Sequence, residues 1–198
     1  TDPSVTGPAG ETTAATETSV AETTISEPQS FEEMFGNQIG VYLNHQYYFE
    51  GEAIPIGETN LYYMNEFMFM SKYASYYGLP MTTLSYMDLA AEFPGEGYAT
   101  CGDLLRTDSE NYIEQVYISC YRAKELNLTL TDSEQQTVDS EIQRMETEAS
   151  DSGMSFEDFM AKYSCPNLSK EDYRIFLENY CIFETYRQYY IKDFLIFF

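Results

Sequence analysis

The clearest hydrophobic pattern in the chain lies between residues 100 and 134. Its hydrophobic residues recur at steps of three and four, at Ile113, Val116, Tyr117, Cys120, Ala123 and Leu126. This spacing places them on one face of a helix with about 3.6 residues per turn. Asn127 tolerates the left-handed conformation of a helix C-cap and predicts where this helix ends. Thr131 and Glu134 have the spacing of a capping box, so a second helix is predicted to begin at once.

Before this junction, the pattern predicts a long helix over residues 58–77, ended by Gly78 and Pro80. One stripe of this helix is hydrophobic, but Tyr, Phe and Met also cover much of the remaining circumference. Such a helix is either central to its bundle or exposed for binding, and central burial is the more common arrangement. Residues 78–99 are rich in Pro and Gly, which predicts a connection with one short helix over residues 83–92.

After the junction, three helices are predicted in close succession. The first covers residues 132–149 and is acidic, with weak hydrophobic periodicity. Ser155 and Asp158 then stand three residues apart, and so do Ser169 and Asp172. In each pair the serine is a good N-cap and the acid is placed to accept a hydrogen bond in return, so each pair predicts the start of a helix.

The chain is therefore predicted to be all-α, or mainly α: a helical bundle with either a short β-hairpin or an irregular lead-in. Residues 31–56 form this lead-in, because a strand-like alternation there is broken by Gly51 and Pro55, and residues 57–198 carry the helices. Residues 1–30 consist mostly of Thr, Ser, Ala, Pro, Gly and Glu and contain no Lys or Arg. Such a segment buries too little apolar surface to offset its ordering entropy, so it is predicted to be a disordered spacer before a single domain over residues 31–198.

The charge of the chain excludes several classes of partner. It has 33 acidic and 10 basic residues and a formal net charge of -23. Binding of nucleic acids or of an anionic membrane surface requires clusters of Lys and Arg, so neither is expected.

The aromatic content of the chain is unusual, because it has 19 Tyr and 13 Phe but no Trp. Some of the tyrosines are expected at the surface, where they provide contact area at low entropic cost.

Few residues suit catalysis or metal binding. Cys101, Cys120, Cys165 and Cys181 follow no C-x-x-C spacing, so no zinc site is predicted. Cys101 and Cys120 share a predicted helix about 28 Å apart at 1.5 Å per residue and cannot pair with each other. A disulfide would have to join different helices, and buried, reduced thiols are the favoured alternative. His45 is the only histidine and has no visible partner. We therefore assign no catalytic residue, no metal and no cofactor.

Several of these segments together resemble a known family. The run Ala123-Lys124-Glu125-Leu126-Asn127-Leu128-Thr129-Leu130-Thr131-Asp132-Ser133-Glu134 is similar to the N-terminal helical domain of bacterial extracytoplasmic foldases of the SurA and PrsA type, whose chaperone region is also similar to that of trigger factor. Asn127 stands where the family has Gly. The similarity continues through residues 155–163 and 168–180, and Glu50-Gly51-Glu52-Ala53-Ile54 looks like the turn that opens the family's first helix. It covers residues 50–193, with 78–99 unmatched.

The resemblance implies a SurA-like helical bundle that acts as a chaperone outside the cytoplasm. It also implies a secreted protein or a Gram-positive type of lipoprotein, attached to the outer face of the cell membrane only through an N-terminal lipid. Family members usually continue into a parvulin-like prolyl isomerase domain, and this chain ends at Phe198, where that domain would begin. We therefore expect the isomerase to be absent or truncated, and whether the protein is an enzyme stays open at this point.

The expected partners are unfolded or secreted polypeptides, held in a cradle of Tyr, Phe and Met between helices. The residues predicted to bind them lie off the main hydrophobic stripe of the first long helix or near the chain end: Tyr62, Phe69, Tyr73, Tyr76, Tyr189 and Tyr190. This prediction requires that these side chains are exposed. Two alternatives stay open: a surface-displayed module that recognises one partner protein, and the helical part of a prolyl isomerase. The oligomeric state does not follow from the sequence.

Overall fold

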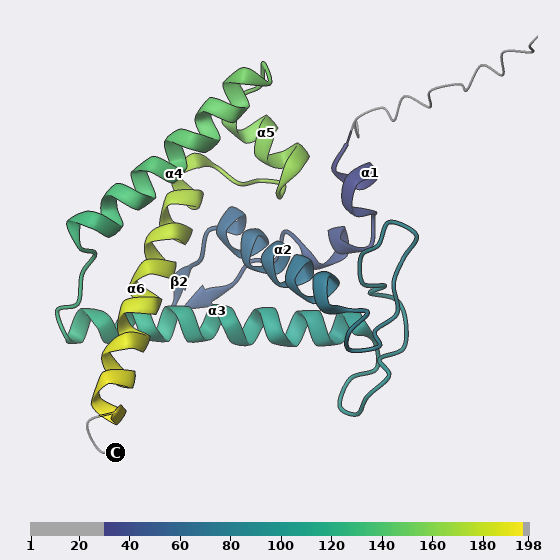
Figure 1. The fold of residues 1–198 in the computed structure, drawn as a ribbon, viewed down its shortest axis with the longest axis horizontal. Helices are drawn as coiled ribbons and strands as arrows, with labels where there is room; N and C mark the ends of the chain where they lie inside the picture. Colours follow the sequence, from purple (N-terminus) through teal and green to yellow (C-terminus); the bar gives the residue numbers. More distant parts are fainter. Residues whose placement is uncertain (1–29, 196–198) are drawn as a thin grey trace, which may run out of the picture.

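The computed structural model of the protein describes residues 30–195, and the side chains of residues 30–191. The predicted spacer over residues 1–30 lies, except for Ser30, outside the described residues. Figure 1 shows a mainly α-helical fold with one two-stranded sheet, as the sequence predicted. The elements in chain order are α1 (Phe31–Phe35), the 3₁₀-helix η1 (Ile39–Tyr42), β1 (Tyr48–Phe49), β2 (Glu52–Ala53), α2 (Ile56–Tyr73), α3 (Cys101–Glu125), α4 (Asp132–Asp151), α5 (Phe156–Tyr163) and α6 (Lys170–Leu195).

Three long helices form the centre of the molecule. α3 runs along the base, α2 packs against it, and α6 crosses it and also contacts α2 (Figure 1). α4 packs on α6 and, with α5, forms an arm that rises away from α3 (Figure 1). Leu105, Ile113 and Val116 of α3 are buried in this core, on the face that the hydrophobic spacing predicted. Because α2 has both α3 and α6 as neighbours, more than one of its faces is buried.

The junction between α3 and α4 has the predicted caps. Asn127 adopts the left-handed conformation with φ of 55°. The Leu128 N–H donates to the Ala123 carbonyl at 2.9 Å and the Asn127 N–H to the Lys124 carbonyl at 3.1 Å, which is the Schellman arrangement. Thr131 and Glu134 then form a full capping box at the start of α4. The predicted caps Ser155 of α5 and Ser169 of α6 are also confirmed.

The lead-in over residues 31–56 is partly helical, which the strand-like alternation did not predict. Ile39 and Leu43 are buried and Val41 is exposed, but they lie in or next to the 3₁₀-helix η1. The hairpin is real and lies further along, between β1 and β2. Its central residues Glu50 and Gly51 both have positive φ, 51° and 84°, as a type I′ turn requires.

The short helix predicted over residues 83–92 is absent, and that prediction is wrong. This connection is irregular, with one isolated bridge between Met81 and Met87 and another between Glu92 and Thr100. Its Met87 side chain is buried, and the Met87 N–H donates to Ser71 Oγ of α2 at 3.0 Å. Ser85 has a positive φ of 64°, which no α-helix contains. Contacts with α2, rather than local propensity, therefore decide the path of this segment.

The four cysteines were predicted either to form disulfides between helices or to stay as buried thiols. All four cysteines are free thiols, with Cys101, Cys120 and Cys165 buried and Cys181 partly so. The favoured alternative of unpaired cysteines is therefore confirmed, and burial holds for Cys101, Cys120 and Cys165.

Among the described helices, none combines the length and the hydropathy that crossing a bilayer needs.

Candidate functional site

The structure exposes five of the six residues predicted to bind polypeptides. The exposed fraction is 57% for Phe69, 37% for Tyr73, 82% for Tyr76, 41% for Tyr189 and 44% for Tyr190. All five are therefore accessible to a partner.

Tyr62 is the exception, and its predicted exposure is wrong. Its side chain is 1% exposed. Its ring lies 4.9 Å from that of Phe176 in α6 and 5.7 Å from that of Tyr112 in α3, measured between centroids, and its hydroxyl donates to Glu58 at 3.2 Å. The face of α2 that lies off the main stripe is covered by α6 and α3 at Tyr62 and is uncovered at Phe69, seven residues further along. Tyr62 therefore belongs to the core and to no binding surface.

A first pocket lies at the C-terminal end of α2, and we call it the α2 pocket. Its volume is about 430 Å³. It is lined by side chains from α2, from the 78–99 connection and from α3, among them the aromatic residues and acids Phe69, Tyr73, Tyr77, Phe93, Glu66 and Asp108. A largely apolar hollow with a few polar groups is typical of a binding site.

The local sequence explains how this pocket forms. Phe69, Tyr73 and Tyr77 follow one another at steps of four, and the rings of Phe69 and Tyr73 lie 5.0 Å apart. α2 ends at Tyr73, and Gly78 with φ of 70° turns the chain back, where the Leu79 N–H donates to the Ala74 carbonyl at 2.8 Å. The returning connection then contributes the far wall of the pocket.

Two carboxylates give the α2 pocket its charge. Burial raises the pKa of Glu66, and the negative charge of Asp108 raises it further. Burial also raises the pKa of Asp108. Within the described residues neither carboxylate makes a hydrogen bond or an ion pair, and neither pKa is lowered by a neighbouring Lys or Arg. The pocket thus holds two acids whose charges are not compensated by the described residues.

A second pocket of about 430 Å³ lies between α3 and α6, and we call it the α6 pocket. Its described lining residues are Gln115, Ser119, Phe183, Tyr186, Arg187, Tyr190 and Ile191. The rings of Tyr186 and Tyr190 lie 4.8 Å apart. Arg187 is paired with Glu184 at 2.9 Å, and none of the described carboxylates lines this pocket. The two pockets therefore differ in charge although both are aromatic.

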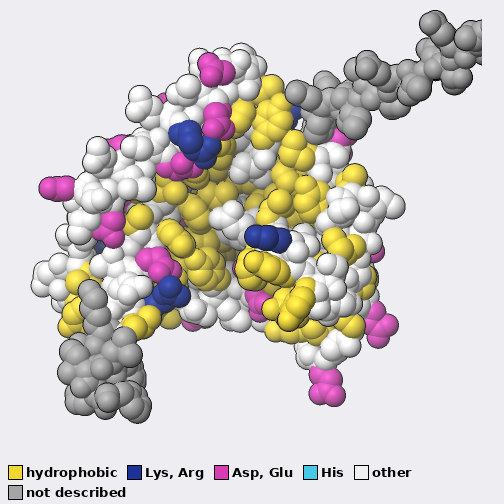
Figure 2. Space-filling model, in the orientation of Figure 1, with side chains coloured by type: hydrophobic (Ala, Val, Ile, Leu, Met, Phe, Trp, Pro, Cys, Tyr) yellow, Lys and Arg dark blue, Asp and Glu magenta, His cyan; other side chains and the backbone are white. Residues whose placement is uncertain are grey.

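Both pockets lie along one face of α3. Leu104 and Asp108 line the α2 pocket, and Gln115 and Ser119 line the α6 pocket. At about 100° and 1.5 Å per residue, these four positions fall within about 60° of one another and span about 22 Å of the helix. Tyr112 lies between them, and its pKa responds both to Glu66 and to Arg187. Figure 2 shows hydrophobic side chains gathered over the region where α2, α3 and α6 meet, with acidic side chains mainly at its edges.

Not every predicted residue lies in these pockets. Phe69 and Tyr73 line the first and Tyr190 the second, whereas Tyr76 and Tyr189 contact lining residues without lining either pocket. Sequence reasoning missed several lining residues. The step of four from Tyr73 pointed to Tyr77, and the step of four from Tyr186 to Tyr190 was equally visible. Nothing in the sequence pointed to Phe93, Glu66 or Asp108, because their meeting depends on packing.

A larger hollow of about 640 Å³ lies between α4 and α6. The α4 side of this hollow carries Ser133, Gln136, Thr137 and Ser140, which are short or polar, and none of the predicted binding residues lies in it. It offers little aromatic contact area, so we do not place the binding site there.

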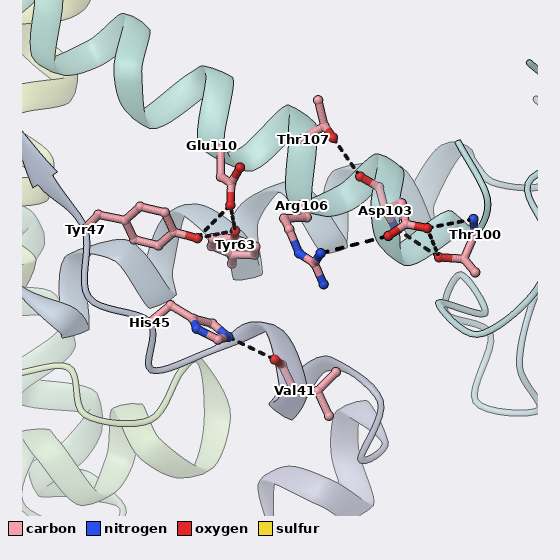
Figure 3. Close-up of polar contacts among 9 residues, drawn as sticks. All are labelled: Val41, His45, Tyr47, Tyr63, Thr100, Asp103, Arg106, Thr107 and Glu110. Atoms are coloured by element: carbon pink, nitrogen blue, oxygen red, sulfur yellow. Dashed lines mark hydrogen bonds and ion pairs between the residues drawn. The ribbon is translucent and has the colours of Figure 1, made fainter. Parts of the chain in front are cut away.

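A separate cluster of polar side chains, shown in Figure 3, includes residue types that also occur in catalytic sites. The Tyr47 and Tyr63 hydroxyls lie 2.7 Å apart, and the Tyr47 hydroxyl donates to Glu110 at 3.0 Å. Burial raises the pKa of both tyrosines, which makes them poorer acids at neutral pH. His45 Nε2 contacts the Val41 carbonyl instead, at 3.1 Å, and the ring points away from this cluster (Figure 3). The cluster links the lead-in to α2 and α3, which is a structural role.

The metal-site geometry and the comparison with known proteins assign no further function to these pockets. Within the described residues no group of three or more His, Cys, Asp or Glu side chains is placed to hold a metal ion. Comparison of the chain with family models, with curated proteins and with solved structures finds no match. The candidate site therefore rests on the geometry of the two pockets.

Proposed function

We propose that this protein is an extracytoplasmic, chaperone-like module that holds unfolded or partly folded polypeptides along the α3 face and performs no catalysis in this chain. The observation that carries the proposal is the alignment of two aromatic pockets on one face of α3. Exposed Phe69, Tyr73 and Tyr190 supply large rings with few rotatable bonds, and Met70 adds a flexible apolar wall. Such surfaces accommodate varied side chains.

The spacing of the pockets fits an extended chain. The middle of the α2 pocket lies near residue 106 of α3 and that of the α6 pocket near residue 117. Eleven residues at 1.5 Å each separate the two by about 16 Å, which an extended polypeptide covers in about five residues at 3.3 Å each. Because side chains alternate between the two sides of an extended chain, a bound segment would place two hydrophobic or amphipathic side chains four or six positions apart in the two pockets.

The resemblance to foldases of the SurA and PrsA type supports the same function and gives its location. The Schellman cap and the capping box at the α3–α4 junction are the features on which that resemblance rests. On this basis the module acts outside the cytoplasm, secreted or held at the membrane by a lipid. A prolyl isomerase domain elsewhere in a longer protein would make the present chain its substrate-holding part.

A second candidate function is recognition of one particular partner by a surface-displayed module. One observation favours it: the uncompensated carboxylates of the α2 pocket give that pocket a chemical preference, which a general holding chaperone does not require. Against it, the two separate hollows suit variable segments better than one flat, complementary interface.

Suppression of aggregation tests the proposal. The protein is mixed at near-stoichiometric ratio with a chemically reduced or heat-unfolded model protein, and light scattering is followed. We expect suppression by the wild type and a loss of most of it in the triple variant Phe69→Ser, Tyr73→Ser and Tyr190→Ser, because truncating an aromatic anchor typically costs about 1–2 kcal/mol of binding. Tyr62 stays unchanged, since its loss would damage the core.

A matched control carries Val41→Ser, Tyr48→Ser and Tyr121→Ser, three exposed hydrophobic residues outside both pockets. This control is expected to suppress aggregation like the wild type, and circular dichroism verifies that both variants fold. No suppression by the folded wild type would reject the chaperone proposal and leave the single-partner module. Equal activity of both triple variants would place the binding surface elsewhere.

A further inference from the structure

The α2 pocket combines aromatic walls with two acidic side chains. Its walls are aromatic, with Phe69, Tyr73 and Tyr77 from α2 and the turn that follows it. Its polar groups are the carboxylates of Glu66 and Asp108, which are partly buried and close enough for one charge to raise the pKa of the other. Like charges in a partly apolar hollow repel each other and are poorly solvated, so a cation that enters relieves both effects.

No Lys or Arg among the described side chains fills this role. Lys72 lies over the Tyr73 ring, with Nζ 5.3 Å from its centroid, but it is exposed and does not line the pocket. Arg106 lies on the opposite side of α3, beside Asp103 and over Tyr42. The Lys72 contact illustrates that the Tyr73 ring accepts a cation on its face.

We propose that the α2 pocket binds the side chain of a Lys or Arg in the held polypeptide. The aliphatic stem of that side chain packs against the rings of Phe69, Tyr73 and Tyr77, and its cationic head pairs with Glu66 and Asp108. The occupant follows from charge complementarity, because among the described residues two acids and no base line the pocket. The inference rests on the proposed function, which supplies the polypeptide. The α6 pocket, which no described carboxylate lines, then takes an uncharged apolar or aromatic side chain four or six residues away.

This arrangement gives the bound segment a chemical signature. A lone apolar segment satisfies only the α6 pocket, whereas a segment with one basic and one aromatic residue satisfies both. Charge-assisted hydrogen bonds to the carboxylates and cation–π contacts to the rings act on the same head group. Removing that head group, as in norleucine, which keeps the four-carbon stem of Lys, is therefore expected to weaken binding about tenfold.

Binding of a fluorescein-labelled ten-residue peptide tests the proposal by fluorescence anisotropy with the full chain. The peptide consists of Gly and Ser with one Lys and one Phe six positions apart, which places both side chains on one side of an extended chain. Two matched peptides carry norleucine or Glu in place of the Lys. We expect the Lys peptide to bind about tenfold more tightly than the norleucine peptide, and the Glu peptide to bind most weakly.

Protein variants test whether the preference for the Lys peptide comes from Glu66 and Asp108. In Glu66→Gln with Asp108→Asn, the Lys and norleucine peptides are expected to bind equally, because the shape of the pocket is kept and its charge is removed. The control is Glu92→Gln with Glu96→Gln, which removes the same charge from exposed residues outside the pocket lining and is expected to keep the tenfold preference. Loss of the preference in this control as well would attribute it to net charge and overturn the proposal. The single variant Glu66→Gln serves the same comparison should the double variant fold poorly.

The outcomes separate this inference from the proposed function. Equal binding of the Lys and norleucine peptides to the wild type overturns the inference, while suppression of aggregation still supports the holding function. Binding of neither peptide, together with no suppression, rejects both. Free lysine amide or putrescine serves as the last competitor. If the free amine displaced the labelled peptide at a concentration equal to that of the peptide, the pocket would be a receptor for small amines. That result would overturn the assignment to a polypeptide side chain.

Discussion

Among single residues, the acidic side chain of Glu58 lies fully buried between α2, α3 and α6. Its carboxylate accepts hydrogen bonds from the Tyr62 hydroxyl at 3.2 Å, the Tyr117 hydroxyl at 2.7 Å and the Asn179 amide at 2.9 Å. Burial raises the pKa of Glu58, and these hydrogen bonds, that from Tyr117 foremost, oppose the rise. Since all three donors are neutral, they compensate for the buried charge only in part.

Replacing Glu58 by Ala is expected to destabilise the fold by about 3 kcal/mol, because it opens a cavity and leaves the Tyr117 hydroxyl and the Asn179 amide without their acceptor. Glu58→Gln keeps the shape and one carbonyl acceptor, so its loss of stability is expected to be smaller. Urea unfolding at neutral pH measures the free energy of unfolding of each variant. An Ala variant as stable as the wild type would contradict the role assigned to these hydrogen bonds.

Glu58 also makes the free energy of unfolding depend on pH, and the sign of this dependence follows from its raised pKa. Because the pKa of Glu58 is higher in the folded than in the unfolded state, the folded state binds a proton more readily. Its contribution to stability is therefore greatest below the unfolded pKa, about 4.3, and is lost as pH rises through the folded pKa. We expect Glu58→Gln to gain stability relative to the wild type as pH rises from 4 to 7, in parallel urea titrations. A difference that does not change with pH would contradict this.

At the scale of helices and loops, the ends of the helices follow from contacts over a few residues. Asn127 closes α3 and Thr131 opens α4 through hydrogen bonds that reach at most five positions along the chain. Those ends were predictable from the sequence for that reason. The path of the 78–99 connection depends instead on tertiary contacts. Buried Met87 and its hydrogen bond to Ser71 of α2 hold this connection in an irregular path.

A close contact at the start of α2 leads to a prediction about packing between elements. A Cβ added at Gly57 would lie 2.5 Å from the Asn167 carbonyl oxygen and 2.8 Å from Leu168 Cα. Both are backbone atoms, so the segment before α6 would have to move. We expect Gly57→Ala to lower the free energy of unfolding by about 1–2 kcal/mol, since the strain exceeds the gain in helix propensity.

The control for this prediction is Gly40→Ala in the 3₁₀-helix η1, where an added Cβ meets nothing within 4 Å. Its stability in urea is expected to stay close to that of the wild type. Equal effects of the two substitutions would show that the approach of the backbones does not set the change in stability, because the effect of Gly→Ala on chain entropy is stabilising and common to both sites.

At the scale of the whole molecule, the net charge of -23 acts beyond any single contact. Under the proposed function, such a field would attract basic polypeptides and increase the rate of encounter, while the α2 pocket would select which segments stay bound. The two effects differ in range. Long-range attraction between exposed charges is screened by salt, because the Debye length falls from about 10 Å at 0.1 M to about 3 Å at 1 M.

Two unfolded client proteins of similar size, one basic and one acidic, distinguish these effects. We expect suppression of aggregation of the basic client to decrease as NaCl rises from 50 to 500 mM, and that of the acidic client to change little or improve. The variant Glu66→Gln with Asp108→Asn removes only two acidic side chains, so it is expected to keep most of this salt dependence. The same salt response for both clients would show that net charge does not select among them.

The sequence by itself determined helices α2 to α6, most of their caps and the acidic surface, because each depends on composition or on neighbours within a few positions. Tertiary structure alone decided that Tyr62 is buried, since α2 packs against both α3 and α6 and has more than one covered face. It also brought Glu66 of α2 and Asp108 of α3 into one pocket with Phe93 from the connection between them. Such a meeting depends on how helices cross, and the periodicity of one helix carries no information about the residues that face it from another.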